Sequence, residues 1–118
     1  MAQRMTVREM LEERGEALQL TILAGDDGLD NIITTGDLNR PSLALAGFYE
    51  HFSSERVQIV GVTEHEYLSR TERRLRTSRI ERMFGYAMPC VIVTTGINPV
   101  PEMTLAAQRH GMPLLMTR

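Results

Sequence analysis

The sequence contains no lysine, and all thirteen of its basic residues are arginine. A P-loop needs the pattern G-x-x-x-x-G-K-[ST], in which the lysine reaches the phosphates and the hydroxyl binds magnesium. Neither this lysine nor the glycine spacing occurs here. The strand lysine with which a protein kinase holds its nucleotide is absent too. P-loop or kinase-type phosphoryl transfer by these 118 residues alone is therefore excluded.

Cysteine and long apolar runs are also scarce. The single cysteine, Cys90, excludes an internal disulfide and fits a reducing cytosol. No apolar run approaches the ~18 residues of a membrane span, and the first residues lead into a charged helical pattern without a visible signal peptide. A net charge of −2 gives no general attraction to nucleic acid or to an anionic membrane. We expect a cytoplasmic protein with neither of these as a partner.

Length and patterning predict one α/β domain over residues 1–118. Apolar and alternating runs predict strands at 18–24, 29–35, 57–62, 90–95 and 114–117, and the first two could pair as a hairpin. Helical patterns cover 7–14, 42–48, 64–69, 70–82 and 101–110, with a possible interruption at 77–78. Capping boxes are expected at Thr6–Glu9 and at Thr63–Glu66, and Gly111 is expected to end the last helix.

The later predicted strands alternate with helices, and this order is typical of parallel βαβ units. The strand at 90–95 belongs to two such units, one with 57–62 and one with 114–117. Sharing a strand joins the two units into one sheet. We therefore predict a small, three-layer-like sheet of mostly parallel strands with helices on its faces.

The stretch 37–64 is the most distinctive part of the chain. It reads D-L-N-R-P-S-L-A-L-A-G-F-Y at 37–49 and, after a short aromatic spacer, S-E-R-V-Q-I-V-G-V-T-E at 54–64. It resembles the amino-terminal domain of the bacterial HPr kinase/phosphorylase family, whose members phosphorylate and dephosphorylate a serine of the phosphocarrier HPr. The resemblance continues at L-A-G-D-D-G-L-D (23–30) and P-C-V-I-V-T-T-G (89–96), and so covers nearly the whole chain.

The resemblance implies that this chain is a piece of a longer enzyme, whose P-loop kinase domain follows the amino-terminal domain. The parent would use ATP and magnesium, form oligomers and control carbon-source use. It implies a structural, regulatory or assembly-related role here and a fold similar to the amino-terminal domain of Mur ligases. Its own kinase domain, HPr and further copies of the chain are the implied partners. It supplies no catalytic, cofactor-binding or metal-binding residue for this chain.

Two T-T-G segments, at 34–36 and 94–96, each lie at or just past the end of a predicted strand. Ligands of open α/β sheets bind at the carboxyl ends of the strands, so Thr35, Gly36, Thr95 and Gly96 could hold a phosphate or a sugar. This position supports an alternative function, a free-standing sensor of a phosphorylated metabolite. The other interpretation is that threonine extends the strand and glycine turns the chain.

Asp37 and Arg40 are the remaining candidates. They could pair with each other, or cap the following helix through Asn39. Arg40 could also bind a carboxylate or phosphate, because its guanidinium fork suits both. His51, His65 and His110 lack the spacing of a zinc site.

The segment 70–82 carries six arginines and could form a surface for HPr or nucleic acid. Interleaved glutamates and missing aromatic residues favour a solvated or subunit-contact helix instead. Aromatic and methionine side chains flank this segment and could form either core or a contact patch; they are Phe48, Tyr49, Phe52, Met83, Phe84, Tyr86 and Met88.

Overall fold

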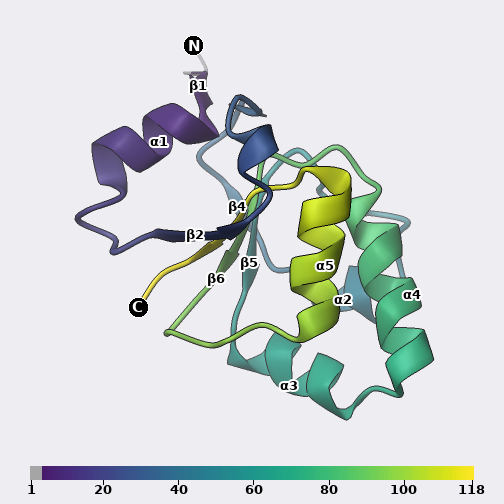
Figure 1. Ribbon diagram of the computed structural model, residues 1–118. Coiled ribbons are helices and arrows are strands. Elements are labelled where there is room, and N and C mark those ends of the chain that lie inside the picture. The colour runs from purple at the N-terminus through teal and green to yellow at the C-terminus, as the bar shows by residue number, and fades with distance from the viewer. Residues whose placement is uncertain (1–3) are drawn as a thin grey trace.

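The computed structural model describes residues 4–118 and has an α/β architecture built on a five-stranded sheet (Figure 1). Across the sheet the strands follow the order β2-β7-β6-β5-β4. Their bounds are Thr21–Ala24 (β2), Leu38–Asn39 (β4), Val57–Val60 (β5), Val91–Val93 (β6) and Leu114–Met116 (β7). The pairs β4–β5, β5–β6 and β6–β7 are parallel, and β2 runs antiparallel to β7. The prediction of a mostly parallel sheet is confirmed.

Five helices and one 3-10 turn connect or flank these strands. They are α1 (Val7–Arg14), η1 (Asp26–Gly28), α2 (Ser42–Leu45), α3 (Val62–Arg70), α4 (Arg73–Phe84) and α5 (Pro101–His110). The capping box of α1 is confirmed, because Thr6 and Glu9 each bind the other's backbone N–H at 3.0 Å. Gly111 ends α5 in the left-handed conformation, with φ +60. Within residues 4–118 no helix has the length and apolarity to cross a membrane.

The two faces of the sheet carry different layers, as alternation along the strands requires. On one face, Val60, Val91 and Leu114 pack with side chains of α2, α3, α4 and α5. On the other, Ile92 and Leu115 pack with α1 and with a two-stranded ribbon of β1 (Met5–Thr6) and β3 (Ile32–Ile33). Figure 1 shows α1 and the four later helices on opposite sides of the strands. The sheet is therefore covered on both faces.

The predicted hairpin of 18–24 with 29–35 is wrong. β2 pairs with β7, and β3 pairs with β1. The reason lies at the start of α1, where the first N–H groups of a helix have no partner within the helix. Arg8 N–H donates to Leu29 O at 2.8 Å and Val7 N–H donates to Asn31 O at 2.9 Å. The segment after η1 is thereby drawn to α1 and away from β2.

The arginine-rich segment 70–82 does not form a single helix. The possible interruption at 77–78 does not occur either, because α4 runs through these residues without a break. The break falls at Thr71 and Glu72 instead, between α3 and α4. The carboxylate of Glu72 accepts from the N–H groups of Arg74 and Leu75 at 3.1 and 3.0 Å and caps α4. A side-chain acceptor just before a helix stabilises a new start there, which explains the interruption.

Candidate functional site

Polar side chains of the stretch 37–64 bind one another around β4 and β5. Gln58 of β5 is fully buried, and its amide oxygen accepts from Asn39 Nδ2 at 2.7 Å. Its amide nitrogen donates to Ser53 O and Arg56 O at 2.9 and 2.8 Å. Buried polar groups are tolerated when they are hydrogen-bonded, and Gln58 is bonded at both ends. Asn39 thus joins β4 to β5. The cap of α2 that the sequence had suggested for Asn39 is not formed.

Glu64 is the centre of this polar cluster. Its side chain is only 2% exposed, and its Oε1 accepts from Gly61 N–H at 2.7 Å and from Arg40 Nη2 at 2.8 Å. Its Oε2 accepts from Ser42 Oγ at 2.5 Å. Arg40 and Ser42 follow β4, whereas Gly61 and Glu64 follow β5. One carboxylate therefore fastens the start of α2 to the start of α3.

Two predictions about these residues are wrong. Arg40 pairs with Glu64 and not with Asp37. The capping glutamate of α3 is Glu64 at its third position and not Glu66, because the helix begins one residue before Thr63. A carboxylate at the first turn of a helix satisfies an orphan N–H and complements the positive end of the helix dipole. Glu64 does this for α3 while binding two side chains from another element.

The protonation of Glu64 reflects these contacts. Burial alone raises the pKa of this carboxyl, but hydrogen bonds from Arg40, Ser42 and the Gly61 N–H, with the charge of Arg40, outweigh burial. The net pKa is lowered from the ordinary value of 4.5. The site is thus built for a charged Glu64 at neutral pH. Charge-assisted hydrogen bonds of this kind are stronger than neutral ones.

This shift predicts a pH dependence. A carboxyl whose pKa is lower in the folded state stabilises the protein above its unfolded pKa, and this contribution is lost as pH falls through the folded pKa. We expect the difference in unfolding free energy between the natural protein and Glu64→Gln to be constant above about pH 5. It should shrink as the pH falls below 4.5. Urea titrations of both proteins from neutral to acidic pH measure this difference.

The comparison with Glu64→Gln matters because Glu72 and Glu102 also have lowered pKa values. Both proteins should therefore lose stability in acid, and their difference isolates Glu64. A difference that stays constant through the acid range would contradict the assignment.

The two T-T-G segments lie at opposite ends of the sheet. Thr95 and Gly96 follow the carboxyl end of β6, whereas Thr35 and Gly36 precede the amino end of β4, and both strands run in the same direction. They cannot form one site together. Thr35 Oγ1 accepts from Asp37 N–H at 3.1 Å, which closes a local turn. Gly96 N–H donates to Thr117 O at 2.9 Å beside β7.

Thr95 and Gly96 retain the position at which sheet ligands bind. Both have left-handed backbones, with φ +56 and +64, and no atom lies within 4 Å of the place where a Cβ of Gly96 would stand. Arg40 follows β4 at the same edge of the sheet, two strands away from β6. The geometry thus leaves an open loop at this edge.

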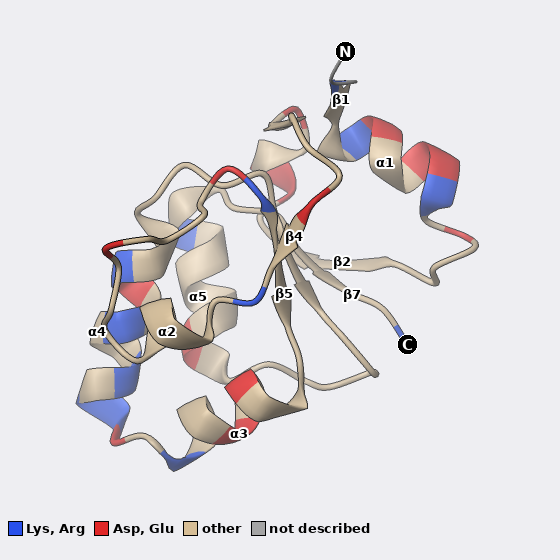
Figure 2. Ribbon diagram, turned by 180° about the vertical axis from the view of Figure 1, so that it is seen from behind, with Lys and Arg blue, Asp and Glu red and all other residues tan. Residues whose placement is uncertain are grey.

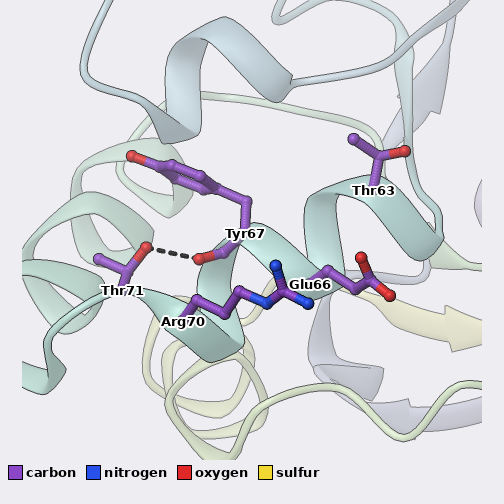
Figure 3. A pocket seen from close by; sticks show the side chains of 5 residues that line it. All are labelled: Thr63, Glu66, Tyr67, Arg70 and Thr71. Carbon is purple, nitrogen blue, oxygen red and sulfur yellow. Dashed lines mark hydrogen bonds between the residues drawn. The ribbon is translucent and has the colours of Figure 1, made fainter.

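Two surface hollows lie beside α3 and α2, on the side of the sheet that α2, α3, α4 and α5 cover. One, of about 350 Å³, follows the outer face of α3 and is lined by Thr63, Glu66, Tyr67, Arg70 and Thr71 (Figure 3). In it, Thr71 Oγ1 donates to the backbone oxygen of Tyr67 at 2.6 Å. The other, of about 130 Å³, lies against α2 and is lined in part by Arg40 and Ser42.

The arginines of α4 are used in part within the fold. Arg76 pairs with Glu102 of α5 at 3.0 Å, and Arg79 donates to Leu45 O of α2 at 3.1 Å. The guanidinium carbon of Arg82 lies 4.2 Å from the ring centre of Tyr49. Figure 2 shows basic residues along α4, at the opposite end of the molecule from α1. Arg76, Arg79 and Arg82, three of the five arginines of α4, thus hold this helix against its neighbours.

The aromatic and methionine cluster is divided between core and surface. Tyr49, Met83, Phe84 and Met88 are buried, whereas Phe48 is 48% exposed. The rings of Tyr49 and Tyr86 stack at 5.5 Å. Most of this cluster is therefore core.

Metal and thiol chemistry find little support in the residues that the structure describes. Within 4–118, no three His, Cys, Asp or Glu side chains gather as a metal would require. His110 lies 3.2 Å from Glu81 Oε1, which Arg109 also contacts at 2.8 Å. Burial raises the pKa of the Cys90 thiol to about 12, so this residue is not a nucleophile at neutral pH.

Sequence comparison gives one consistent result. The family model described as HPr Serine kinase N terminus matches residues 5–118. Relatives described as HPr kinase/phosphorylase include that of Thermoanaerobacter sp. (strain X514), 42% identical over 86% of this chain and 32% of the relative. That of Treponema pallidum (strain Nichols) is 41% identical over 92% of this chain and 34% of the relative. This chain spans about a third of the length of these relatives.

A structural comparison supports the fold. A solved chain described as the CBS and DRTGG domains of the regulatory region of Clostridium perfringens pyrophosphatase, complexed with its activator diadenosine tetraphosphate, matches with a TM-score of 0.60. The match covers 94% of this chain and 42% of that chain, with 14% sequence identity. At this identity the likeness concerns the fold alone. The expected likeness to Mur ligases stays a prediction.

Proposed function

This chain belongs to the HPr Serine kinase N terminus family, and we propose that it is the non-catalytic, regulatory or assembly-related part of an HPr kinase/phosphorylase. The observation that carries the proposal is the match over residues 5–118 together with relatives about three times as long. In the proposed parent, a separate domain uses ATP and magnesium to phosphorylate a serine of HPr and also removes that phosphate. The parent would be a cytoplasmic homo-oligomer that controls carbon metabolism.

Two features of the chain support a role without catalysis. The absence of lysine removes the residue that a P-loop uses on its phosphates. The polar side chains of the family stretch 37–64 also bind one another, with Glu64 holding Arg40 and Ser42. Such residues stabilise the connection between α2 and α3. The proposal includes a likeness to the amino-terminal domains of Mur ligases.

A chimaera tests the proposal. In the Thermoanaerobacter relative, the region that aligns with this chain is either deleted or replaced by this chain. We expect the deletion to change assembly or regulation and the chimaera to restore both, while phosphorylation of HPr depends on the remainder of the relative. Light scattering and an HPr phosphorylation assay measure the two properties.

The isolated chain is the control for catalysis. We expect it to give no ATP hydrolysis and no phosphorylation of HPr above the blank. Turnover by the pure chain would overturn the proposal. So would a deletion enzyme that assembles and responds to effectors as the intact relative does.

A metabolite sensor is the second candidate, and the open loop at Thr95 and Gly96 favours it. This loop follows a parallel strand at the edge where ligands of such sheets bind. Calorimetry with ATP and with glucose 6-phosphate separates the two functions. For an assembly domain we expect no heat of binding up to about 1 mM ligand, a limit corresponding to roughly 4 kcal/mol of binding free energy. Saturable binding that Gly96→Val abolishes would favour the sensor.

A further inference from the structure

The charges of this chain are divided between its two ends. Residues 7–30, which include α1 and η1, carry seven acidic and two basic side chains, a net charge of −5. Residues 70–82 carry six arginines and two glutamates, a net charge of +4. Figure 2 shows α1 and α4 at opposite ends of the molecule, whose longest axis is 40 Å. Exposed charges are screened beyond about 10 Å at 0.1 M salt, so the two ends do not neutralise each other within one molecule.

The solvent side of α4 carries arginines without an acidic partner. Arg74, Ser78 and Arg82 follow one another at intervals of four residues and are all exposed; we call them the α4 stripe. Within residues 4–118, no carboxylate oxygen lies within 4.0 Å of a side-chain nitrogen of Arg74 or Arg82. The contact of Arg82 with the ring of Tyr49 leaves its charge in place. At 1.5 Å per residue, the two cations of the stripe are about 12 Å apart along the helix.

The acidic residues of α4 and α5 are bound to other groups. Glu72 uses both carboxylate oxygens to accept from the first N–H groups of α4. Glu81 is contacted by Arg109 at 2.8 Å and by His110 at 3.2 Å. Glu102 is 12% exposed at its side chain and pairs with the inner side of α4. None of these carboxylates therefore cancels the charge of the α4 stripe.

α1 carries the opposite charge along its own solvent side. Its glutamates are exposed and fall within about 100° of one another around the helix axis; they are Glu9, Glu12, Glu13 and Glu16, which we call the α1 stripe. Glu16 stands in the turn that directly follows the helix. Within the described residues, no basic side chain lies within 4.0 Å of the carboxylates of Glu12, Glu13 or Glu16. The stripe extends over about 11 Å, close to the length of the α4 stripe.

The two arginines of α1 do not neutralise this stripe. Arg8 pairs with Asp30 at 3.1 Å. Arg14 lies on the side of α1 that carries the buried Val7, about 100° or more around the axis from each glutamate. The α1 stripe is therefore left with an excess of negative charge.

We propose that the α4 stripe of one molecule docks on the α1 stripe of a second copy of this chain. The two stripes match in length and are opposite in charge. Pairing of like stripes would place arginine against arginine or glutamate against glutamate, which is unfavourable. The net charge of −2 disfavours nucleic acid or an anionic membrane as the partner of the basic stripe. An antiparallel pair makes the contact twice, and a ring or an open chain of copies makes it once per neighbour.

The contact uses only the charges of this chain, so it does not depend on the family assignment. Because exposed ion pairs contribute little individually, we expect weak association with a Kd on the order of 0.1–1 mM. Sedimentation equilibrium of the full chain at up to about 1 mM in about 50 mM NaCl should show an average mass that rises with concentration. Raising NaCl to about 500 mM should weaken the association at least tenfold, because salt screens exposed charges.

Charge reversal on each stripe identifies the surfaces that meet. One variant combines Arg74→Glu with Arg82→Glu, and the other combines Glu13→Arg with Glu16→Arg. We expect each variant alone to associate at least tenfold more weakly than the natural chain, because all its stripes then have one sign. An equimolar mixture should regain association to within about threefold of the natural chain, because every stripe again meets its opposite.

Two controls accompany these variants. Arg56→Glu with Arg118→Glu makes the same change in net charge outside both stripes and should alter the association less than threefold. Circular dichroism verifies that each variant is folded. Should loss of the contact between Arg82 and Tyr49 unfold the first variant, Arg74→Glu with Ser78→Glu takes its place.

Four results would overturn the proposal. The first is a natural chain that stays monomeric at about 1 mM in low salt. The second is an association that only one of the two reversed variants loses. The third is a mixture of the reversed variants that does not associate. The fourth is tight binding of a short DNA duplex that Arg74→Glu with Arg82→Glu abolishes, without self-association, which would make the α4 stripe a nucleic-acid surface.

Discussion

Gly25→Ala should destabilise the protein by about 3 kcal/mol or more, one of the two largest effects we expect. Gly25 has φ +74, and a Cβ built on it would lie 1.8 Å from Met112 O and 2.9 Å from Pro113 N. Both are backbone atoms of the segment that leads into β7, so no rotamer change can relieve the overlap. β2 and β7 would have to separate where Ala24 opposes Leu114.

Two other glycines of the same chain are controls for this prediction. Gly96 has φ +64 but free space around its Cβ position, so Gly96→Ala should cost only the backbone strain of about 1 kcal/mol. Gly36 has neither a positive φ nor a neighbour within 4 Å, so Gly36→Ala should change stability by less than about 0.5 kcal/mol. The three variants thus separate backbone strain from steric overlap.

Urea unfolding measures all three variants. Far-ultraviolet circular dichroism is the suitable signal, because the chain has no tryptophan. An effect of Gly25→Ala below about 1 kcal/mol, or equal to that of Gly96→Ala, would contradict the importance of the close approach to Met112.

Local sequence patterns were sufficient to predict those helices and strands whose boundaries are set by neighbouring residues. The capping box at Thr6 and Glu9, Pro101 at the start of α5 and Gly111 at its end all act within one turn of their own helix. The buried strand around Val91–Val93 also followed from its run of apolar residues. These features depend on neighbours in sequence, and the sequence displays them directly.

The start of α3 needed information from further away. Thr63 with Glu66 is a complete capping-box pattern, yet the structure uses Glu64 with the N–H of Gly61. Glu64 is selected by Arg40 and Ser42, which lie 24 and 22 residues earlier in the chain. They reach it only because β4 and β5 pair in parallel. A local pattern cannot express a choice made by tertiary contacts.

The two T-T-G segments show the same limit for the candidate site. They are identical in sequence, and each follows a strand. However, β3 belongs to the small ribbon with β1, so the chain enters the main sheet only after Gly36. Thr35 and Thr95 therefore lie at opposite ends of the parallel strands. Their position depends on strand pairing, which the flanking residues do not specify.

Glu64→Ala is the other large effect that we expect, with a loss of about 2–4 kcal/mol of unfolding free energy. The substitution removes an acceptor shared by Gly61 N–H, Arg40 and Ser42. Hydrogen bonds to charged groups contribute about 1.5–3 kcal/mol each, but Arg40 is 56% exposed and water can replace its lost partner. The N–H of Gly61 is buried in this contact and cannot recover in the same way.

Glu66→Ala is the matched control, because Glu66 is an exposed glutamate on the same helix. We expect it to change stability by less than about 0.5 kcal/mol. A double-mutant cycle of Glu64→Ala with Arg40→Ala should give a coupling of about 1 kcal/mol, well below the total effect of Glu64→Ala. That difference would mean that Glu64 stabilises the protein mainly through Gly61 and Ser42, by holding the starts of α2 and α3 together. A coupling that accounts for the whole loss would instead make the ion pair with Arg40 the main source of stability.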